Sequence, residues 1–176
     1  MKKLFIALLL AFLPSVMMAQ NSLFSKFEDK AGVTSVIVNK KMFELMSGVK
    51  MDPKDKDAQR YLNLVKKLDN LKVFTTSSPK YAADMKATVD SYLKSTALDE
   101  LMRINEGGRS IKIYVKQNAG QQVKELLMFI DGGGKDETVL MSLTGTFDLD
   151  DISVLTDKMN LPGGAELNKA AKKQKS

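Results

Sequence analysis

The chain has 176 residues, of which 44% are hydrophobic, and it contains neither histidine nor cysteine. The lack of cysteine excludes disulfides, thiolate chemistry and a lipid-modified N-terminus. The lack of histidine excludes the commonest zinc ligand and every Ser-His or Cys-His nucleophile. The net charge of +6 does not indicate a nucleic-acid partner, because six lysines lie at the two ends of the chain and leave the remainder neutral.

Residues 1–19, MKKLFIALLLAFLPSVMMA, have the pattern of a signal peptide. Lys2 and Lys3 precede an apolar run over residues 4–13. This run is about half of the roughly 20 residues that a membrane-spanning helix needs. We therefore expect cleavage near Ala19-Gln20, a periplasmic or secreted protein, and no transmembrane span after cleavage.

Capping signals and apolar spacing predict alternating helices and strands over residues 22–104. Gly48 ends one helix, and Asp52 with Pro53 begins the next. In order, we expect a helix at 22–31, a strand at 33–39, helices at 40–47 and 52–70, a strand at 71–77, and helices at 79–93 and 97–104.

The second half of the chain predicts three consecutive strands followed by a helix. The expected strands are 110–117, 122–130 and 137–147, and Asp148 is expected to cap the last helix. In 110–117, isoleucine and valine alternate with Lys112, Tyr114 and Lys116, as in a sheet with one face in water. These three residues are our candidate binding surface for an acidic partner. The strand 122–130 is apolar on both faces, so we expect both faces to be covered.

The segment DGGGKDETVLMSLTGTFDLDD, residues 131–151, contains glycines beside a lysine and then several carboxylates. A phosphate-binding loop needs a different spacing and a following helix, so residues 131–135 predict a hairpin turn. Asp148, Asp150 and Asp151 do not match a calcium loop and suit the positive end of a helix. We expect no metal and no cofactor.

Two Ser-x-x-Lys spacings, Ser77 with Lys80 and Ser91 with Lys94, lack the companion motifs of Ser-Lys enzymes. A carboxylate centre stays open as an alternative. The methionines Met42, Met85, Met128 and Met141 are expected in the core, with a methionine-rich binding groove as the other interpretation.

These elements predict the α+β class: a mixed, mainly antiparallel sheet of about five strands with helices packed largely on one face. We expect one domain over residues 20–160 and a disordered basic tail over residues 161–176. The tail lysines Lys169, Lys172, Lys173 and Lys175 are candidate contacts for an acidic surface.

Several segments resemble an uncharacterised exported family of Bacteroidetes, domain of unknown function 4252. They are VTSVIVNKKMFELM at 33–46, LDNLKVFTTSS at 68–78 and FDLDDISVLTDKM at 147–159. The resemblance implies a small cell-envelope protein and transfers no active-site residue. It favours a regulatory or binding role over an enzyme.

We therefore expect an exported, non-enzymatic binding or regulatory module of the cell envelope, with an envelope protein or an acidic surface as its partner and no nucleic acid. Two alternatives remain: an envelope hydrolase with a carboxylate or Ser-Lys centre, and a protein held at a surface by its lysine-rich tail.

Overall fold

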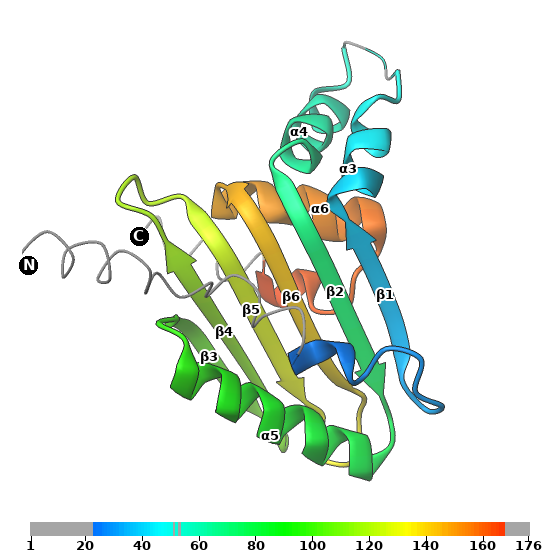
Figure 1. The fold of residues 1–176 in the computed structure, drawn as a ribbon, viewed down its shortest axis with the longest axis vertical. Coiled ribbons are helices and arrows are strands. Elements are labelled where there is room, and N and C mark those ends of the chain that lie inside the picture. Colours follow the sequence, from blue (N-terminus) through cyan, green and yellow to red (C-terminus); the bar gives the residue numbers. More distant parts are fainter. Residues whose placement is uncertain (1–22, 51, 53, 168–176) are drawn as a thin grey trace, which may run out of the picture.

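The computed structural model describes residues 23–50, 52 and 54–167, and these residues contain one six-stranded sheet. The order across the sheet is β1-β2-β6-β5-β4-β3, and every pair of neighbours is antiparallel (Figure 1). The strands are β1 (Thr34–Asn39), β2 (Leu68–Thr76), β3 (Asp99–Glu106), β4 (Arg109–Gln117), β5 (Val123–Asp131) and β6 (Thr138–Phe147). The α+β class is thus confirmed, whereas the expected parallel pairing is wrong.

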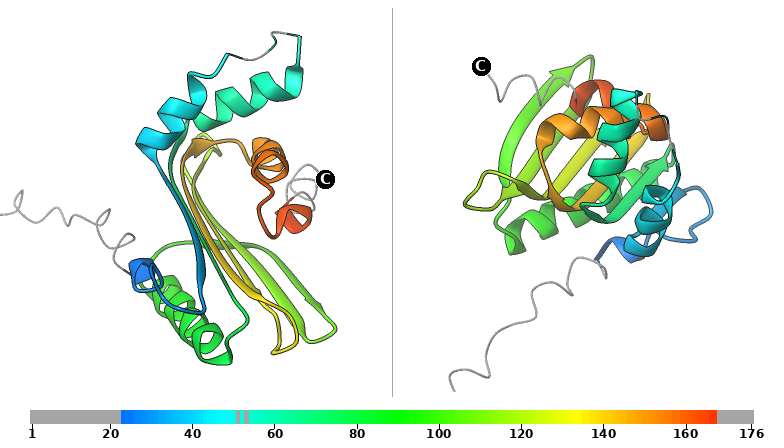
Figure 2. Two further views of the ribbon diagram at one scale, coloured as in Figure 1. Left: turned by 90° about the vertical axis from the view of Figure 1, so that its right-hand side faces the viewer. Right: turned by 90° about the horizontal axis from the view of Figure 1, so that it is seen from above.

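Helices cover both faces of this sheet, whereas the sequence predicted helices packed largely on one face. Figure 2 shows α5 and the segment 23–29 on one face, and α6 and residues 161–167 on the other, with α4 above α6 at one end of the sheet. The helices are α3 (Lys40–Ser47), α4 (Lys56–Val65), α5 (Pro79–Ser95) and α6 (Ile152–Met159), the last preceded by the 3-10 turn η2 (Leu149–Asp151). None of the described helices combines the length and the apolar character that a bilayer crossing requires.

The central strand β5 explains why two layers of helices are needed. Leu126 and Met128 are buried in the core beneath α4 and α6, whereas Leu127 and Phe129 are buried in a second core beneath α5. Successive side chains of a strand point to opposite faces. A strand with apolar side chains on both faces therefore has to be covered on both faces, as the sequence of β5 predicts.

The segment expected as a helix at 97–104 is the strand β3. Gly107 and Gly108 follow it with φ of +59° and +90°. Positive φ at both central residues is the geometry of the tight hairpin turns that match the twist of two antiparallel strands. The glycines therefore turn β3 back onto β4, with Met102 opposite Ile113, instead of ending a helix.

Further boundaries also differ from the predicted ones. The helix expected to reach residue 70 ends at Val65, because β2 begins at Leu68, which pairs with Gly145 of β6. Helix α4 begins after Asp55, whose carboxylate accepts a hydrogen bond from the Ala58 N–H at 2.9 Å, so Asp52 is not its cap. The first residues of the expected tail, 161–167, belong to the fold, because Leu161 and Leu167 are buried in the core that also contains residues of α6. The predicted signal peptide and the four tail lysines lie outside the described residues.

The two-sided core makes a quantitative prediction for adjacent residues of β5. Leu126→Ala and Leu127→Ala should each lower the free energy of unfolding by about 2–5 kcal/mol, because each leaves a cavity in a different core. The exposed control Lys66→Ala should change it by less than about 0.5 kcal/mol. Urea unfolding of the three variants measures the effect. A negligible loss for Leu127→Ala would show that α5 does not pack tightly on the sheet.

Candidate functional site

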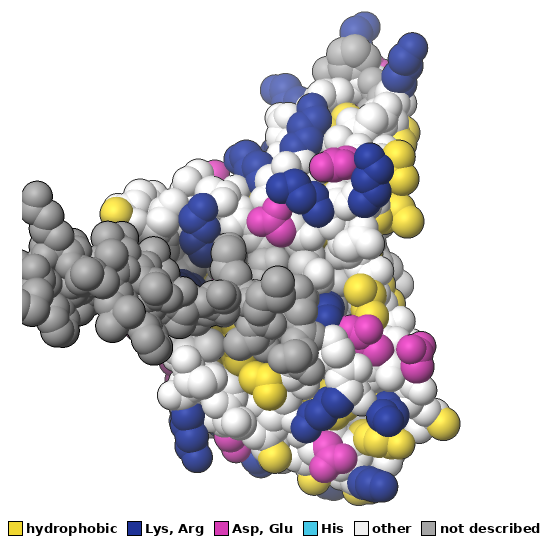
Figure 3. Space-filling view, in the orientation of Figure 1, with side chains coloured by type: hydrophobic (Ala, Val, Ile, Leu, Met, Phe, Trp, Pro, Cys, Tyr) yellow, Lys and Arg dark blue, Asp and Glu magenta, His cyan; other side chains and the backbone are white. Residues whose placement is uncertain are grey.

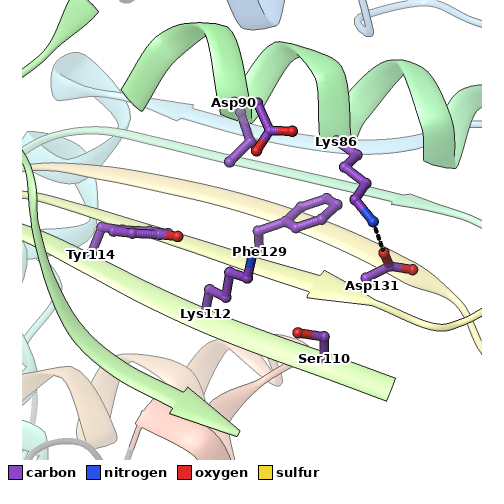
Figure 4. Close-up of a pocket in the computed structure, with 8 residues that line it drawn as sticks. Lys86, Asp90, Ser110, Lys112, Tyr114, Phe129 and Asp131 are labelled. Carbon is purple, nitrogen blue, oxygen red and sulfur yellow. Dashed lines mark hydrogen bonds and ion pairs between the residues drawn. The ribbon is translucent and has the colours of Figure 1, made fainter. Parts of the chain in front are cut away.

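A small pocket lies between α5 and the neighbouring strands β4 and β5, on the face that carries the second core (Figure 4). Its volume is about 40 Å³. The lining residues are Lys86, Val89 and Asp90 from α5, Ser110, Lys112 and Tyr114 from β4, and Phe129 and Asp131 from β5. Two of the three residues predicted for the binding surface, Lys112 and Tyr114, are therefore part of this pocket.

Strand register and helix periodicity bring these side chains together. On the sheet, Ser110 lies opposite Asp131 and Lys112 lies opposite Phe129, so residues of β4 and β5 share one face. On α5, Lys86 and Asp90 are four residues apart and project from the same side of the helix. The pocket forms where this polar side of α5 passes over the polar residues of the two strands.

One ion pair closes one end of the pocket. Lys86 Nζ lies 3.0 Å from Asp131 Oδ2, which joins α5 to the end of β5. Asp131 also accepts a hydrogen bond of 3.1 Å from the Gly133 N–H. Burial acts to raise the pKa of Asp131, but the Gly133 N–H and the Lys86 ammonium outweigh it and hold that pKa below the usual aspartate value.

The glycine run after Asp131 has a structural role, as the hairpin prediction requires. Residues 132–136 form the turn, in which the Lys135 N–H donates to the Gly132 carbonyl at 3.2 Å. Gly133 has φ of +63°, and a Cβ at this position would overlap the carbonyl oxygen of Gly108 in the β3–β4 turn. The glycine thus lets two turns touch and directs its own N–H to Asp131.

Tyr114 is buried, so its expected place on a wet face was wrong. Helix α5 covers this side chain. The pKa of its phenol is raised, mainly by this burial and secondly by the charge of the nearby Glu100 carboxylate. Glu100, opposite Tyr114 on β3, is held by two bonds from Arg103, Nε to Oε1 at 3.0 Å and Nη2 to Oε2 at 2.5 Å. This guanidinium lowers the pKa of Glu100.

Lys112 and Lys116, the two lysines of β4, have no ion-pair partner in the described part of the chain. Lys116 is exposed, whereas Lys112 is half-buried at the pocket. Lys112 interacts electrostatically with Asp131 and Glu100. Each of those carboxylates, however, forms its ion pair with another cation, Asp131 with Lys86 and Glu100 with Arg103. The Lys112 ammonium is therefore available to a ligand.

Sequence reasoning missed Lys86, Asp90 and Asp131 as members of the site. Asp131 was interpreted only as a turn residue. Lys86 and Asp90 each follow an apolar residue of the α5 stripe, Met85 and Val89. Their position next to these buried residues was the signal in the sequence that Lys86 and Asp90 border the side of α5 that packs on the sheet.

The other candidates do not form a centre in the described residues. Asp148 pairs with Lys67 at 3.8 Å and Asp151 pairs with Arg60 at 3.3 Å, so these carboxylates lie beside cations. Among the described residues, no three His, Cys, Asp or Glu side chains gather as metal ligands. Ser77, Lys80, Ser91 and Lys94 are exposed on or next to α5.

Comparison with known proteins identifies a family. The model of a family described as Domain of unknown function (DUF4252) matches residues 27–155. No curated protein and no solved structure matches the chain. The matched range includes all residues of the pocket between α5 and β4.

The lowered pKa of Asp131 predicts a pH dependence of stability. Its carboxylate is stabilised in the fold, so its contribution is present above the unfolded-state pKa and is lost as the pH falls through the lower folded-state pKa. Asp131→Asn should therefore be less stable than wild type at pH 7, and the difference should shrink below about pH 4. Urea unfolding at both pH values measures this. Asp136→Asn, exposed in the same turn, is the control, and an equal pH dependence for both variants would contradict the assignment.

Proposed function

The chain belongs to the family described as Domain of unknown function (DUF4252), and we propose that it is an exported, non-enzymatic binding module that holds an acidic group of a partner protein at Lys112. The observation that carries this proposal is the half-buried side chain of Lys112, which lines the pocket and has no ion pair in the described part of the chain. A positive charge without a partner beside a protein surface is stabilised when an opposite charge arrives. An incoming carboxylate would supply that charge and a strong hydrogen bond.

The size of the pocket favours a side chain over a free small molecule. Its volume of about 40 Å³ is far below the roughly 300–1,000 Å³ of sites that enclose drug-sized ligands. It suffices for a few water molecules, since one water needs about 10–15 Å³ in this measure. A carboxylate group on a longer chain fits this space, with the rest of the partner lying over the surface beside exposed Lys116.

The charges around the pocket favour an acidic group. Lys86 is neutralised by Asp131, and Arg103 is neutralised by Glu100. Among the charged residues that line the pocket, Lys112 and Asp90 are the two that remain without an ion pair. Of these two, Lys112 is the group that attracts a carboxylate of a partner.

The hydroxyl group in the pocket supports binding rather than nucleophilic chemistry. Ser110 Oγ donates a hydrogen bond of 2.8 Å to Asn105 Oδ1 on β3. A serine nucleophile needs its proton directed to a base. Here the proton is directed to the amide oxygen of Asn105 and not to a base.

Residues 1–19 have the signal-peptide pattern, and on this ground we place the partner in the cell envelope or outside the cell. The proposed partner is thus an exported or envelope protein that presents an acidic segment.

A titration with a fluorescein-labelled hexaglutamate peptide tests the proposal by fluorescence anisotropy in low salt. Lys112→Met retains the aliphatic stem of the side chain and should weaken binding by at least about tenfold, because the charge-assisted hydrogen bond is lost. Lys66→Met removes one charge from the exposed end of α4 and should leave binding nearly unchanged. Equal affinities for the two variants would remove Lys112 from the proposed site.

A further inference from the structure

The exposed hydrophobic residues of this protein are concentrated at one edge. In the described part of the chain, every large hydrophobic residue that is exposed lies between residues 36 and 49, on β1, on α3 or just after it. The residues are Val36, Ile37, Met42, Leu45 and Val49, with exposed fractions of 41–62%. Figure 3 shows hydrophobic side chains along the right-hand edge, where Figure 1 places α3 and β1. We call this set the β1–α3 patch.

Met42 belongs to this patch and not to the core, so its sequence interpretation was wrong. Phe43 is the buried residue of α3, and it packs with Val38 in the core under α4. Met85, Met128 and Met141 are buried as expected. The exposed methionine thus lies at the same edge as the exposed strand.

The two edge strands differ in how they are protected from pairing. Strand β3 carries Asp99, Glu100, Arg103 and Glu106, and its register is interrupted between Glu100 and Met102. Charges and bulges are the usual protection of a sheet edge. Strand β1, TSVIVN, has no charge and no proline, and it pairs with β2 in continuous register from Thr34 to Asn39. Within the described residues no strand pairs with its outer edge.

The charges that border the patch identify the kind of partner. Lys40 pairs with Asp69 at 2.9 Å, and Lys41 pairs with Glu44 at 3.3 Å. The charges beside β1 and at the start of α3 are therefore balanced, and along this strand neither an acidic nor a basic partner has an electrostatic advantage. The exposed Lys50 lies beyond the strand, next to Val49. A second copy of the same neutral, apolar edge is complementary in charge, whereas two copies of β3 would bring together strands that each carry three acids and one arginine.

We propose that the β1–α3 patch is the interface of a homodimer, in which the two β1 strands pair antiparallel about a two-fold axis. The pairing joins both sheets into one and satisfies the outward backbone N–H and C=O groups of β1. It also brings Val36 and Ile37 of each copy beside their counterparts and places the exposed side chains of α3 next to the contact. The surface is separate from the Lys112 pocket, so it does not depend on the proposed binding function.

Sedimentation velocity of the purified protein from micromolar to millimolar concentration tests this interface. The wild type should form dimers, and Ile37→Lys should raise the dissociation constant by at least about tenfold, because it places two lysines near the axis. Asn105→Lys, on the other edge strand, is the matched control and should dimerise as the wild type does. A wild type that stays monomeric throughout, or a dimer unchanged by Ile37→Lys, would overturn the proposal.

Single cysteines give a second measurement that does not rely on a destabilising charge. Because the chain has no cysteine, oxidation of a variant with one cysteine can form only a disulfide between two copies. Cysteines placed in turn at Ser35, Val36 and Ile37 should give covalent dimers at the position closest to the axis, where the Cα atoms approach within about 7 Å. Asn105→Cys should not. Equal cross-linking at Asn105, or none along β1, would place the contact elsewhere.

Discussion

Leu126 and Leu127 are consecutive residues in the middle of the sheet, and both are completely buried. Since their side chains point to opposite faces, the sheet is stable only if something apolar covers each face. Helices α4 and α6 with residues 161–167 cover one face, and α5 with Phe24 and Phe27 covers the other. The long path of the chain between β2 and β3 follows from this constraint, because it carries α5 across the second face (Figure 2).

The pocket is a consequence of the same covering. Helix α5 presents the apolar residues Met85, Val89 and Tyr92 to the sheet, and Lys86 and Asp90 lie at the border of that apolar side. Where this border passes over β4 and β5, charged residues of the helix meet Lys112 and Asp131. The ion pair of Lys86 with Asp131 then neutralises two of these four charges and leaves Lys112 and Asp90 without an ion pair in the described residues. The pocket proposed as a recognition site thus lies at the margin of a core and not in a deep cavity.

Most elements were predictable because their signals are local. The cap and stop of α3, the proline that begins α5 and the turn after Asp131 are set by nearby residues. The errors concern long-range pairing. Residues 99–106 have helical apolar spacing in isolation, but pairing with β4 turns them into a strand.

For the candidate site, the alternation of Lys112 and Tyr114 pointed to the strand and the face on which the pocket lies. It could not show that a helix from the preceding segment would bury Tyr114, because no local pattern states where α5 docks. The same limit applies to Met42, whose apolar character fits a core residue until the docking of α3 leaves it exposed.

The contact between Gly133 and Gly108 links two hairpins that are adjacent in space but separated in sequence. A side chain cannot be added at residue 133 unless the β3–β4 turn moves away, and a longer β3–β4 turn cannot be accommodated unless residue 133 retreats. Among relatives, the lengths of these two loops should therefore change together, and an insertion in one without a matching change in the other should be rare. Since the Gly133 N–H also holds Asp131, variation in the β3–β4 hairpin would reach the charge balance beside Lys112 without altering any residue that lines the pocket.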